Sequence, residues 1–95
     1  MTSTIASAAL RRRTTLRGEV VNVVAYERPW VRSDVTVSDG TGNLVLRFMG
    51  RRHIPGMVPG RRVRADGTPG LVRGNLVMVN PLYSFDDAGC GSGIN

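Results

Sequence analysis

The stretch VRSDVTVSDGTGNLVLRFM, residues Val31–Met49, decides the fold. Its first half alternates valine with polar residues, and every second residue from Leu44 to Phe48 is again large and apolar. Alternation with a period of two is typical of a half-buried β-strand. Between the two halves lies Asp39–Asn43, DGTGN, in which glycine allows positive φ and the aspartate can bond the turn backbone. The stretch therefore predicts a β-hairpin, and we expect the other strands to be added around it.

The length and the cysteine content limit the classes of protein that remain. The chain has 95 residues, enough for one small domain, and it has no run of about 18 apolar residues that could span a membrane. At its start the charges follow a short apolar part, unlike in a secretory signal. The single cysteine, Cys90, excludes an internal disulfide and a zinc site built on cysteines. We expect a cytoplasmic protein.

The charge balance points to a partner. Thirteen basic residues, all arginine, stand against seven acidic ones, which gives a formal net charge of +6. A GC-rich genome explains the missing lysine but not the excess of positive charge. A small basic domain most often binds nucleic acid, and an anionic membrane surface comes second.

The hairpin is flanked by one long strand before it and two strands after it. The first strand is predicted over Thr14–Tyr26, with a bulge or bend at Val23–Val24. The later strands are predicted over Arg61–Asp66 and Gly74–Tyr83, the last closing near Pro81. Turn residues fill Gly67–Gly70 between them, with an extension of the hairpin tip over Leu71–Arg73 as the alternative. The linker that follows the hairpin, GRRHIPGMVPG, has room for one helical turn at most.

Both ends of the chain lack this alternation. Residues 1–13 end in Arg11–Arg13 and predict a flexible basic arm that either touches phosphates or is simply solvated. Residues 86–95 are small, polar and glycine-rich, and we expect a disordered tail. The folded domain is therefore predicted over residues 14–85.

Five strands in so small a domain favour a closed or nearly closed barrel, because closure removes exposed sheet edges. A long first strand, a hairpin, an irregular linker and a second hairpin follow the order of the five-stranded oligonucleotide/oligosaccharide-binding (OB) barrel. SH3-like barrels are the alternative, although they usually place the irregular turn before the last strand. The predicted fold is an all-β, five-stranded OB-fold barrel.

The chain resembles one family of OB domains, the wedge domain of RecG-type branch-migrating helicases. The matching segments cover about three quarters of the chain, and they are Gly18–Val21, Val35–Gly42, Leu44–Phe48, Pro59–Val63 and Met78–Tyr83. The resemblance implies a nucleic-acid-binding module, here without the helicase motor, because no GxxxxGK[ST] motif occurs. It also implies base stacking at the end of strand three, where this chain has Met49 and His53 beside Phe48.

Aromatic and basic residues gather where an OB barrel binds single strands, on strands two and three and the flanking loops. Trp30, with Arg28 and Arg32 two residues on either side, is the strongest local signal. Its alternative is a hydrophobic plug at the barrel end. For Phe48, Tyr83 and Phe85 packing is the better interpretation. The predicted nucleic-acid-binding residues are Tyr26, Arg28, Trp30, Arg32, Arg47, Met49, Arg51, Arg52, His53 and Arg73.

The same sequence offers no catalytic group or cofactor site. His53 is the only histidine, so a metal site is improbable, and Asp34, Asp39 and Asp66 form no evident acid–base pair. We predict a small non-enzymatic protein that binds nucleic acid, with single-stranded DNA or RNA preferred. The alternative is an adaptor that contacts a protein partner through apolar residues, for which Val45, Val77 and Val79 are the candidates. A third hypothesis, membrane contact by the N-terminal arm, is weakened because that arm lacks Trp and Phe.

Overall fold

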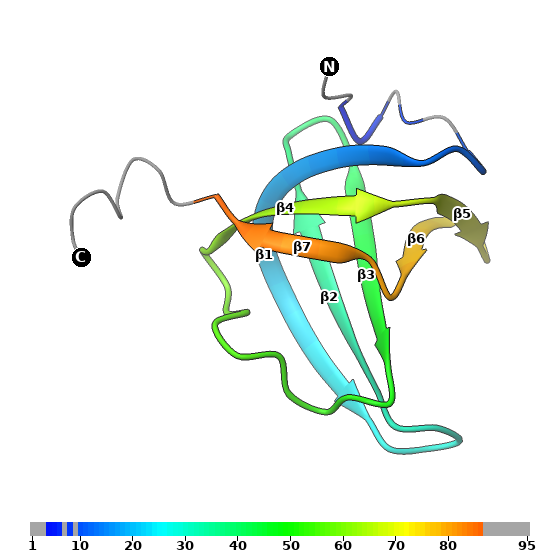
Figure 1. Cartoon of the computed structure of the whole chain (residues 1–95), viewed down its shortest axis with the longest axis vertical. Helices are drawn as coiled ribbons and strands as arrows, with labels where there is room; N and C mark the ends of the chain where they lie inside the picture. The colour runs from blue at the N-terminus through cyan, green and yellow to red at the C-terminus, as the bar shows by residue number, and fades with distance from the viewer. Residues whose placement is uncertain (1–3, 7, 9, 87–95) are drawn as a thin grey trace.

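The computed structural model describes residues 4–6, 8 and 10–86, and this part of the chain is all β. Its strands form one curved sheet in the order β5-β6-β3-β2-β1-β4-β7 (Figure 1). No helix occurs in the described residues, the linker after β3 included. The strands are β1 (Thr14–Tyr26), β2 (Arg32–Ser38), β3 (Asn43–Met49), β4 (Arg62–Gly67), β5 (Pro69–Val72), β6 (Asn75–Val79) and β7 (Leu82–Phe85).

The predicted hairpin is confirmed as β2 and β3. The two strands pair antiparallel from Arg32 opposite Met49 to Ser38 opposite Asn43. Every second residue of each strand is buried, as the alternation predicted. In the turn between them, the Asp39 carboxylate accepts hydrogen bonds from the Thr41 backbone N–H at 2.9 Å and from its hydroxyl at 2.6 Å.

The long strand β1 serves two neighbours. Its first half pairs with β4 and its second half with β2, and the register slips between Val20 and Asn22. The predicted irregularity at Val23–Val24 is thus wrong by two or three residues, because the slip falls where β1 leaves one partner for the other. Gly18 allows this close approach, since a Cβ there would lie 2.9 Å from the carbonyl oxygen of Ser38.

The chain joins the two sides of the curved sheet where β4 leads into β5, because only Thr68 separates these strands. After this residue the chain leaves β1 and pairs as β5 with β6, which in turn runs parallel to β3. The turn predicted over Gly67–Gly70 is therefore wrong, because the chain continues through it and reverses at Arg73 and Gly74, both at positive φ. The strand predicted over Arg61–Asp66 is therefore interrupted at Thr68 and continues as β5.

The predicted last strand also divides in two. Asn80 has a φ of 49° and its backbone N–H donates to the carbonyl oxygen of Arg47 at 2.7 Å, which ends β6. Pro81 follows and has no N–H to continue the ladder. The chain then turns to β4 and adds β7 at its edge, with Ala65 opposite Tyr83.

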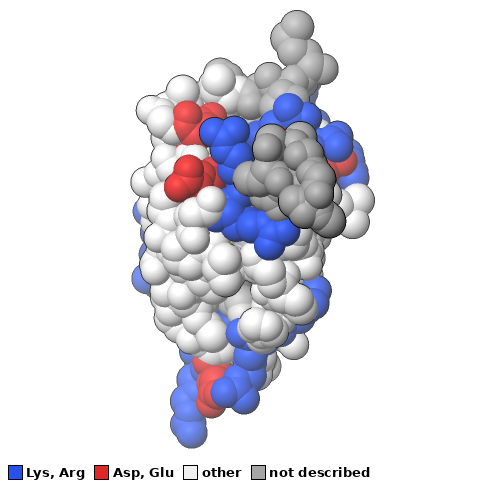
Figure 2. All heavy atoms as spheres, turned by 90° about the vertical axis from the view of Figure 1, so that its left-hand side faces the viewer, with Lys and Arg blue, Asp and Glu red and all other residues white. Residues whose placement is uncertain are grey.

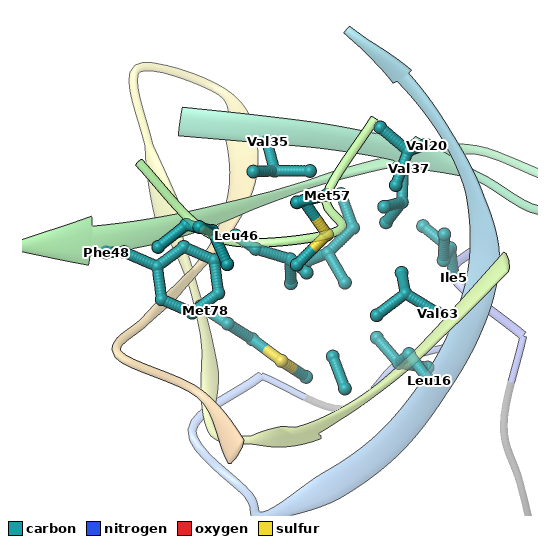
Figure 3. Close-up of a cluster of buried hydrophobic side chains, with 13 residues drawn as sticks. Ile5, Leu16, Val20, Val35, Val37, Leu46, Phe48, Met57, Val63 and Met78 are labelled. Atoms are coloured by element: carbon teal, nitrogen blue, oxygen red, sulfur yellow. The ribbon is translucent and has the colours of Figure 1, made fainter. Parts of the chain in front are cut away.

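The core lies inside the curved sheet (Figure 3). Strand residues such as Leu46 and Val63 meet there, and so do Ile54 and Met57 of the linker, which are both buried. The linker thus contributes to the core, a role that its Pro and Gly content did not predict. The packing roles predicted for Phe48, Tyr83 and Phe85 are confirmed by two edge-to-face ring contacts, Phe48–Tyr83 at 5.4 Å and Tyr83–Phe85 at 5.9 Å between centroids.

The described residues of the N-terminal segment pack on the barrel. The expectation of a flexible arm is therefore corrected for these residues. Ile5 is only 4% exposed and belongs to the core cluster. Its backbone N–H donates to Oδ2 of Asp39 at 2.8 Å. Farther along, the Arg11 N–H donates to the carbonyl oxygen of Pro69 and the Arg13 side chain pairs with Asp66. Apolar burial and backbone pairing both hold this segment.

The predicted C-terminal tail, residues 86–95, lies outside the described residues except for Asp86. The backbone N–H of Asp86 donates to the carbonyl oxygen of Arg62, and its carboxylate lies 3.6 Å from Nε of Arg17. None of the described residues belongs to a helix long and apolar enough to cross a bilayer.

Candidate nucleic-acid interface

The outer face of β2 and β3 carries polar and charged residues in matched rows. Tyr26 of β1, Arg32 of β2 and Met49 of β3 stand side by side across three strands. In the next row Asp34 lies opposite Arg47, and β6 adds Val79 beside Arg47. The pleat that buries Val35 and Leu46 on the inside turns these residues outward.

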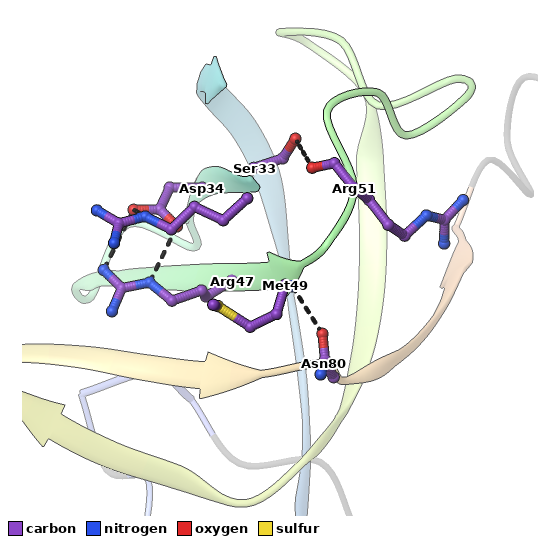
Figure 4. A network of polar contacts seen from close by, with 7 residues as sticks. Ser33, Asp34, Arg47, Met49, Arg51 and Asn80 are labelled. Carbon is purple, nitrogen blue, oxygen red and sulfur yellow. Dashed lines mark hydrogen bonds and ion pairs between the residues drawn. The ribbon is translucent and has the colours of Figure 1, made fainter. Parts of the chain in front are cut away.

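An ion-pair network occupies the first two rows of this face, at the end beside the β1–β2 loop (Figure 4). Arg47 grips the Asp34 carboxylate with two parallel hydrogen bonds, Nε to Oδ1 at 3.0 Å and Nη2 to Oδ2 at 3.2 Å. Arg32 completes the network, with its Nε 3.6 Å from Oδ2 of Asp34. The hydrogen bond to Asp34 raises the pKa of Arg47 above its usual value, against the opposing effect of burial. A two-point pair of this kind is among the stronger charged contacts in proteins.

Two aromatic side chains border the network on the side of the loop between β1 and β2. Tyr26 is 38% exposed, and the guanidinium carbon of Arg32 lies 4.5 Å from the centre of its ring. Trp30 is 67% exposed, so the alternative in which it plugs the barrel is wrong. An exposed indole is free to stack on a ligand ring.

Basic residues of the linker lie beside this loop. The Gly50 N–H donates to the carbonyl oxygen of Val31 at 2.7 Å, which anchors the start of the linker there. Arg51, Arg52 and His53 follow and are all exposed. Arg52 pairs with Glu27 at 2.6 Å, whereas the side chains of Arg28 and Arg51 have no ion-pair partner among the described residues.

Nine of the ten predicted site residues therefore gather at one end of the β2–β3 face. They are Tyr26, Arg28, Trp30, Arg32, Arg47, Met49, Arg51, Arg52 and His53. Arg73 is separate, because it lies in the β5–β6 turn, and β6 starts beside the opposite end of β3. The β5–β6 hairpin and the loop between β1 and β2 project to the same side of the barrel, the right of Figure 1. Arg73 is thus placed at the far end of the face.

Two residues of this face were not predicted from the sequence. Asp34 was read as an isolated carboxylate, although it binds both Arg32 and Arg47. Asn80 holds the end of β3 through its Oδ1, which accepts the Met49 N–H at 2.9 Å. The hairpin register carried the signal for Asp34, because positions 34 and 47 are equally far from the turn.

The apolar contact residues predicted for a protein partner are only partly exposed. Val79 projects to solvent as expected, but Val45 is half-buried and Val77 is buried. For Val77 the prediction was wrong, because this residue lies between β3 and β5 in the middle of β6.

Elsewhere on the barrel, acidic residues accompany the basic ones. On β1 and β4, Arg17 lies opposite Arg64 and Glu19 opposite Arg62. A cleft of about 590 Å³ between these strands and the β2–β3 turn is lined by Arg17, Arg62, Glu19, Asp39 and Asp86, among others. Figure 2 shows both signs of charge on this side, whereas mostly basic side chains cover the lower tip. Within residues 4–6, 8 and 10–86, no three side chains of His, Cys, Asp or Glu form a group that could hold a metal.

Comparison with solved structures identifies the architecture. The chain is similar to a replication factor A related protein from Methanobacterium thermoautotrophicum, with a TM-score of 0.70 and 18% identity over 92% of each chain. The fold is an OB fold. It is also similar to a chain of the S. pombe Stn1–Ten1 complex, with a TM-score of 0.63 and 20% identity. A chain of a replication protein A heterotrimer bound to single-stranded DNA gives a TM-score of 0.61 and 18% identity.

The coverage of these OB structures differs. The alignments take in 78% of this chain for Stn1–Ten1 and 90% for replication protein A, but only 57% and 66% of those two chains. No protein-family model matches the sequence, and no curated protein matches it. The predicted all-β OB fold is confirmed, and the resemblance to the helicase wedge domain stays a prediction.

Proposed function

We propose that this OB-fold chain binds single-stranded nucleic acid, DNA or RNA, as a small module without catalytic activity. The observation that carries the proposal is Trp30, which is 67% exposed in the loop between β1 and β2, two residues from Arg28 and two from Arg32 in the chain. An exposed indole adds little to the stability of the fold, whereas stacking on a base contributes about 1–3 kcal/mol to binding. One of the structurally similar proteins is bound to single-stranded DNA.

The proposed mechanism has two parts. Bases stack on Tyr26 at the end of β1 and on Trp30 in the loop that follows it. Phosphates are attracted by exposed arginines around these rings, chiefly Arg28 and Arg51, with Arg52 shared between Glu27 and the ligand. Arg73 provides a further positive charge at the far end of the face. Each phosphate that is neutralised releases counterions, so binding should weaken as the salt concentration rises.

The test uses the fact that Trp30 is the only tryptophan. Its fluorescence is titrated with oligothymidine, oligouridine and duplex DNA over a series of salt concentrations. We expect quenching by the single strands, with an affinity that falls steeply with salt, and weaker quenching by duplex. The proposal is wrong if none of the three quenches the fluorescence at low salt. Preference for a forked junction over a plain single strand would favour the wedge-like role, with Met49 and His53 at the fork.

A protein-binding role is the second candidate, and exposed aliphatic residues favour it. Leu71, Val79 and Leu82 are each more than half exposed. Two of the structurally similar chains come from protein assemblies, a Stn1–Ten1 complex and a heterotrimer. An apolar interface would be insensitive to moderate salt, so the same salt series separates the two functions.

A further inference from the structure

The end of the β2–β3 face beside the β1–β2 loop carries less positive charge than its two arginines suggest, because the Asp34 carboxylate reduces their charge to a net +1. Both Arg32 and Arg47 direct their guanidinium groups at the carboxylate of Asp34. The side chains of Asp34 and Arg47 are only 14% and 22% exposed, so this pair is screened less than an exposed one. The two rows that should be the most basic part of the interface thus have half of their positive charge balanced from within.

A phosphate cannot take the place of Asp34 without a large cost. If Arg47 turned to a phosphate, it would give up two hydrogen bonds of 3.0 and 3.2 Å and leave the carboxylate with only the 3.6 Å contact to Arg32. That half-buried carboxylate would then lie under a polyanion with a single, longer ion pair, which is destabilising. The phosphates of a bound strand are therefore expected to contact the exposed arginines around these two rows and not Arg32 and Arg47.

The groups that remain in these two rows suit the flat faces of bases. Arg32 is already stacked over the Tyr26 ring at 4.5 Å, and its Nε lies on the carboxylate side. Met49 and Val79 add apolar surface on the two sides of Arg47. A planar guanidinium fixed by a carboxylate presents its own face for stacking.

We infer that Asp34 is a positioning residue that makes the rows of Arg32 and Arg47 bind bases and keeps phosphates on the exposed arginines around them. The inference rests on the proposed function, because it concerns how a single strand lies on the same surface. The binding face should therefore prefer nucleic acid with exposed bases to other polyanions of equal charge. Removing the negative charge should convert these two rows into a phosphate site.

The experiment compares the wild type with Asp34→Asn, using fluorescence anisotropy of end-labelled oligomers. One oligomer has about 12 thymidines, within the range of one OB domain, and the other is an abasic strand with the same number of phosphates. The wild type should prefer the thymidine strand. In Asp34→Asn we expect tighter binding of both strands, a smaller preference between them, and a log Kd against log salt slope that is steeper by about 0.7–1.4, for one or two added phosphate contacts.

Asp66→Asn is the matched control. It removes one negative charge as well, but Asp66 pairs with Arg13 on another part of the barrel. The control should leave the base preference and the salt slope close to those of the wild type. If Asp34→Asn behaves like the control, the inference is overturned while the proposed function stands. If the wild type binds neither oligomer at low salt, the proposed function fails together with the inference.

A second measurement on the wild type covers the case in which Asp34→Asn does not fold. Arginine Nε–H signals are followed by nuclear magnetic resonance before and after saturation with the thymidine strand. We expect the Arg47 Nε–H to stay protected from exchange, because it still donates to Asp34 in the complex. Loss of this protection, with a change in the Nε–H chemical shift like that of Arg28, would show that Arg47 turns to a phosphate. That result would overturn the inference.

Discussion

The backbone N–H of Ile5 donates to Oδ2 of Asp39 at 2.8 Å, and this bond joins the first described residues to the turn between β2 and β3. The Ala6 N–H makes the next contact, to the Thr41 hydroxyl at 3.1 Å. The side chain of Ile5 enters the core over Gly42, where a Cβ would lie 3.3 Å from its Cγ2. The described residues before β1 therefore pack on the folded barrel, ahead of the domain start predicted at residue 14.

Replacing Ile5 with Ala should destabilise the domain by about 2–4 kcal/mol, because it leaves a cavity at a buried site. Urea denaturation followed by circular dichroism measures the change. Leu10→Ala is the control, since Leu10 belongs to the same segment and is exposed. Equal stabilities of the two variants would show that the segment detaches and that residues 1–13 form an arm after all.

Asp39 should make the stability depend on pH in the acid range. Burial alone would raise the pKa of Asp39, but the hydrogen bonds from Thr41, Ile5 and Gly42 outweigh it and lower the pKa below the usual 3.8. A carboxyl whose pKa is depressed by folding adds stability above the unfolded pKa, and this stability is lost as the pH falls through the folded pKa.

The variant Asp39→Asn should therefore lose about 1–3 kcal/mol at pH 7, as expected for bonds to a charged acceptor. Between pH 4 and pH 2 the wild type should approach the variant, and the difference should shrink. Thermal melts of both proteins over this range provide the measurement. A difference in free energy of unfolding that stays constant with pH would contradict the assigned role of the carboxylate.

Trp30→Ala should separate binding from stability. Because the indole is 67% exposed, the melting temperature should change little. Affinity for oligothymidine should fall by about 1–3 kcal/mol, the contribution of one stacked base. Trp30→Phe should recover part of it. A Trp30→Ala protein that folds and binds normally would leave Arg28 and Arg51 as the main contacts.

Gly18→Ala should destabilise the barrel by about 1–3 kcal/mol, as overpacking does. The added Cβ would lie 2.9 Å from the Ser38 carbonyl oxygen, and backbone atoms cannot move aside cheaply. Gly70→Ala is the control, because a Cβ at Gly70 meets nothing within 4 Å and its φ is not positive. Chemical denaturation of both variants should show a cost for Gly18 only.

The elements that alternate over a whole strand were predictable from sequence. The bounds of β1 agree with the predicted Thr14–Tyr26, and the β2–β3 hairpin pairs as expected. Local pattern fixes such strands because one face must be buried. The continuation through Thr68 was not predictable, since Gly67–Gly70 has the composition of a turn, and only the pairing of β5 with β6 shows that it is not one.

The buried roles of Ile5, Ile54 and Met57 depend on contacts between segments far apart in the chain. Each lies among residues without periodicity, so no local signal distinguishes it from a solvated residue. At the candidate site, the aromatic and basic residues could be found by type and position. The partnership of Asp34 with Arg47 required the register of the hairpin, which sequence alone leaves uncertain by one residue.

The parallel pairing of β6 with β3 has a consequence for how the protein folds. Val45 and Val77 are neighbours in the sheet but 32 positions apart in the chain, so this contact must wait for a long loop to close. The β2–β3 hairpin can form first and act as the template, and the sealing of the barrel should be the slow event, on a timescale of about milliseconds to seconds. Until then the free edge of β3 is exposed, and nascent chains at high concentration would be most prone to pair with one another there.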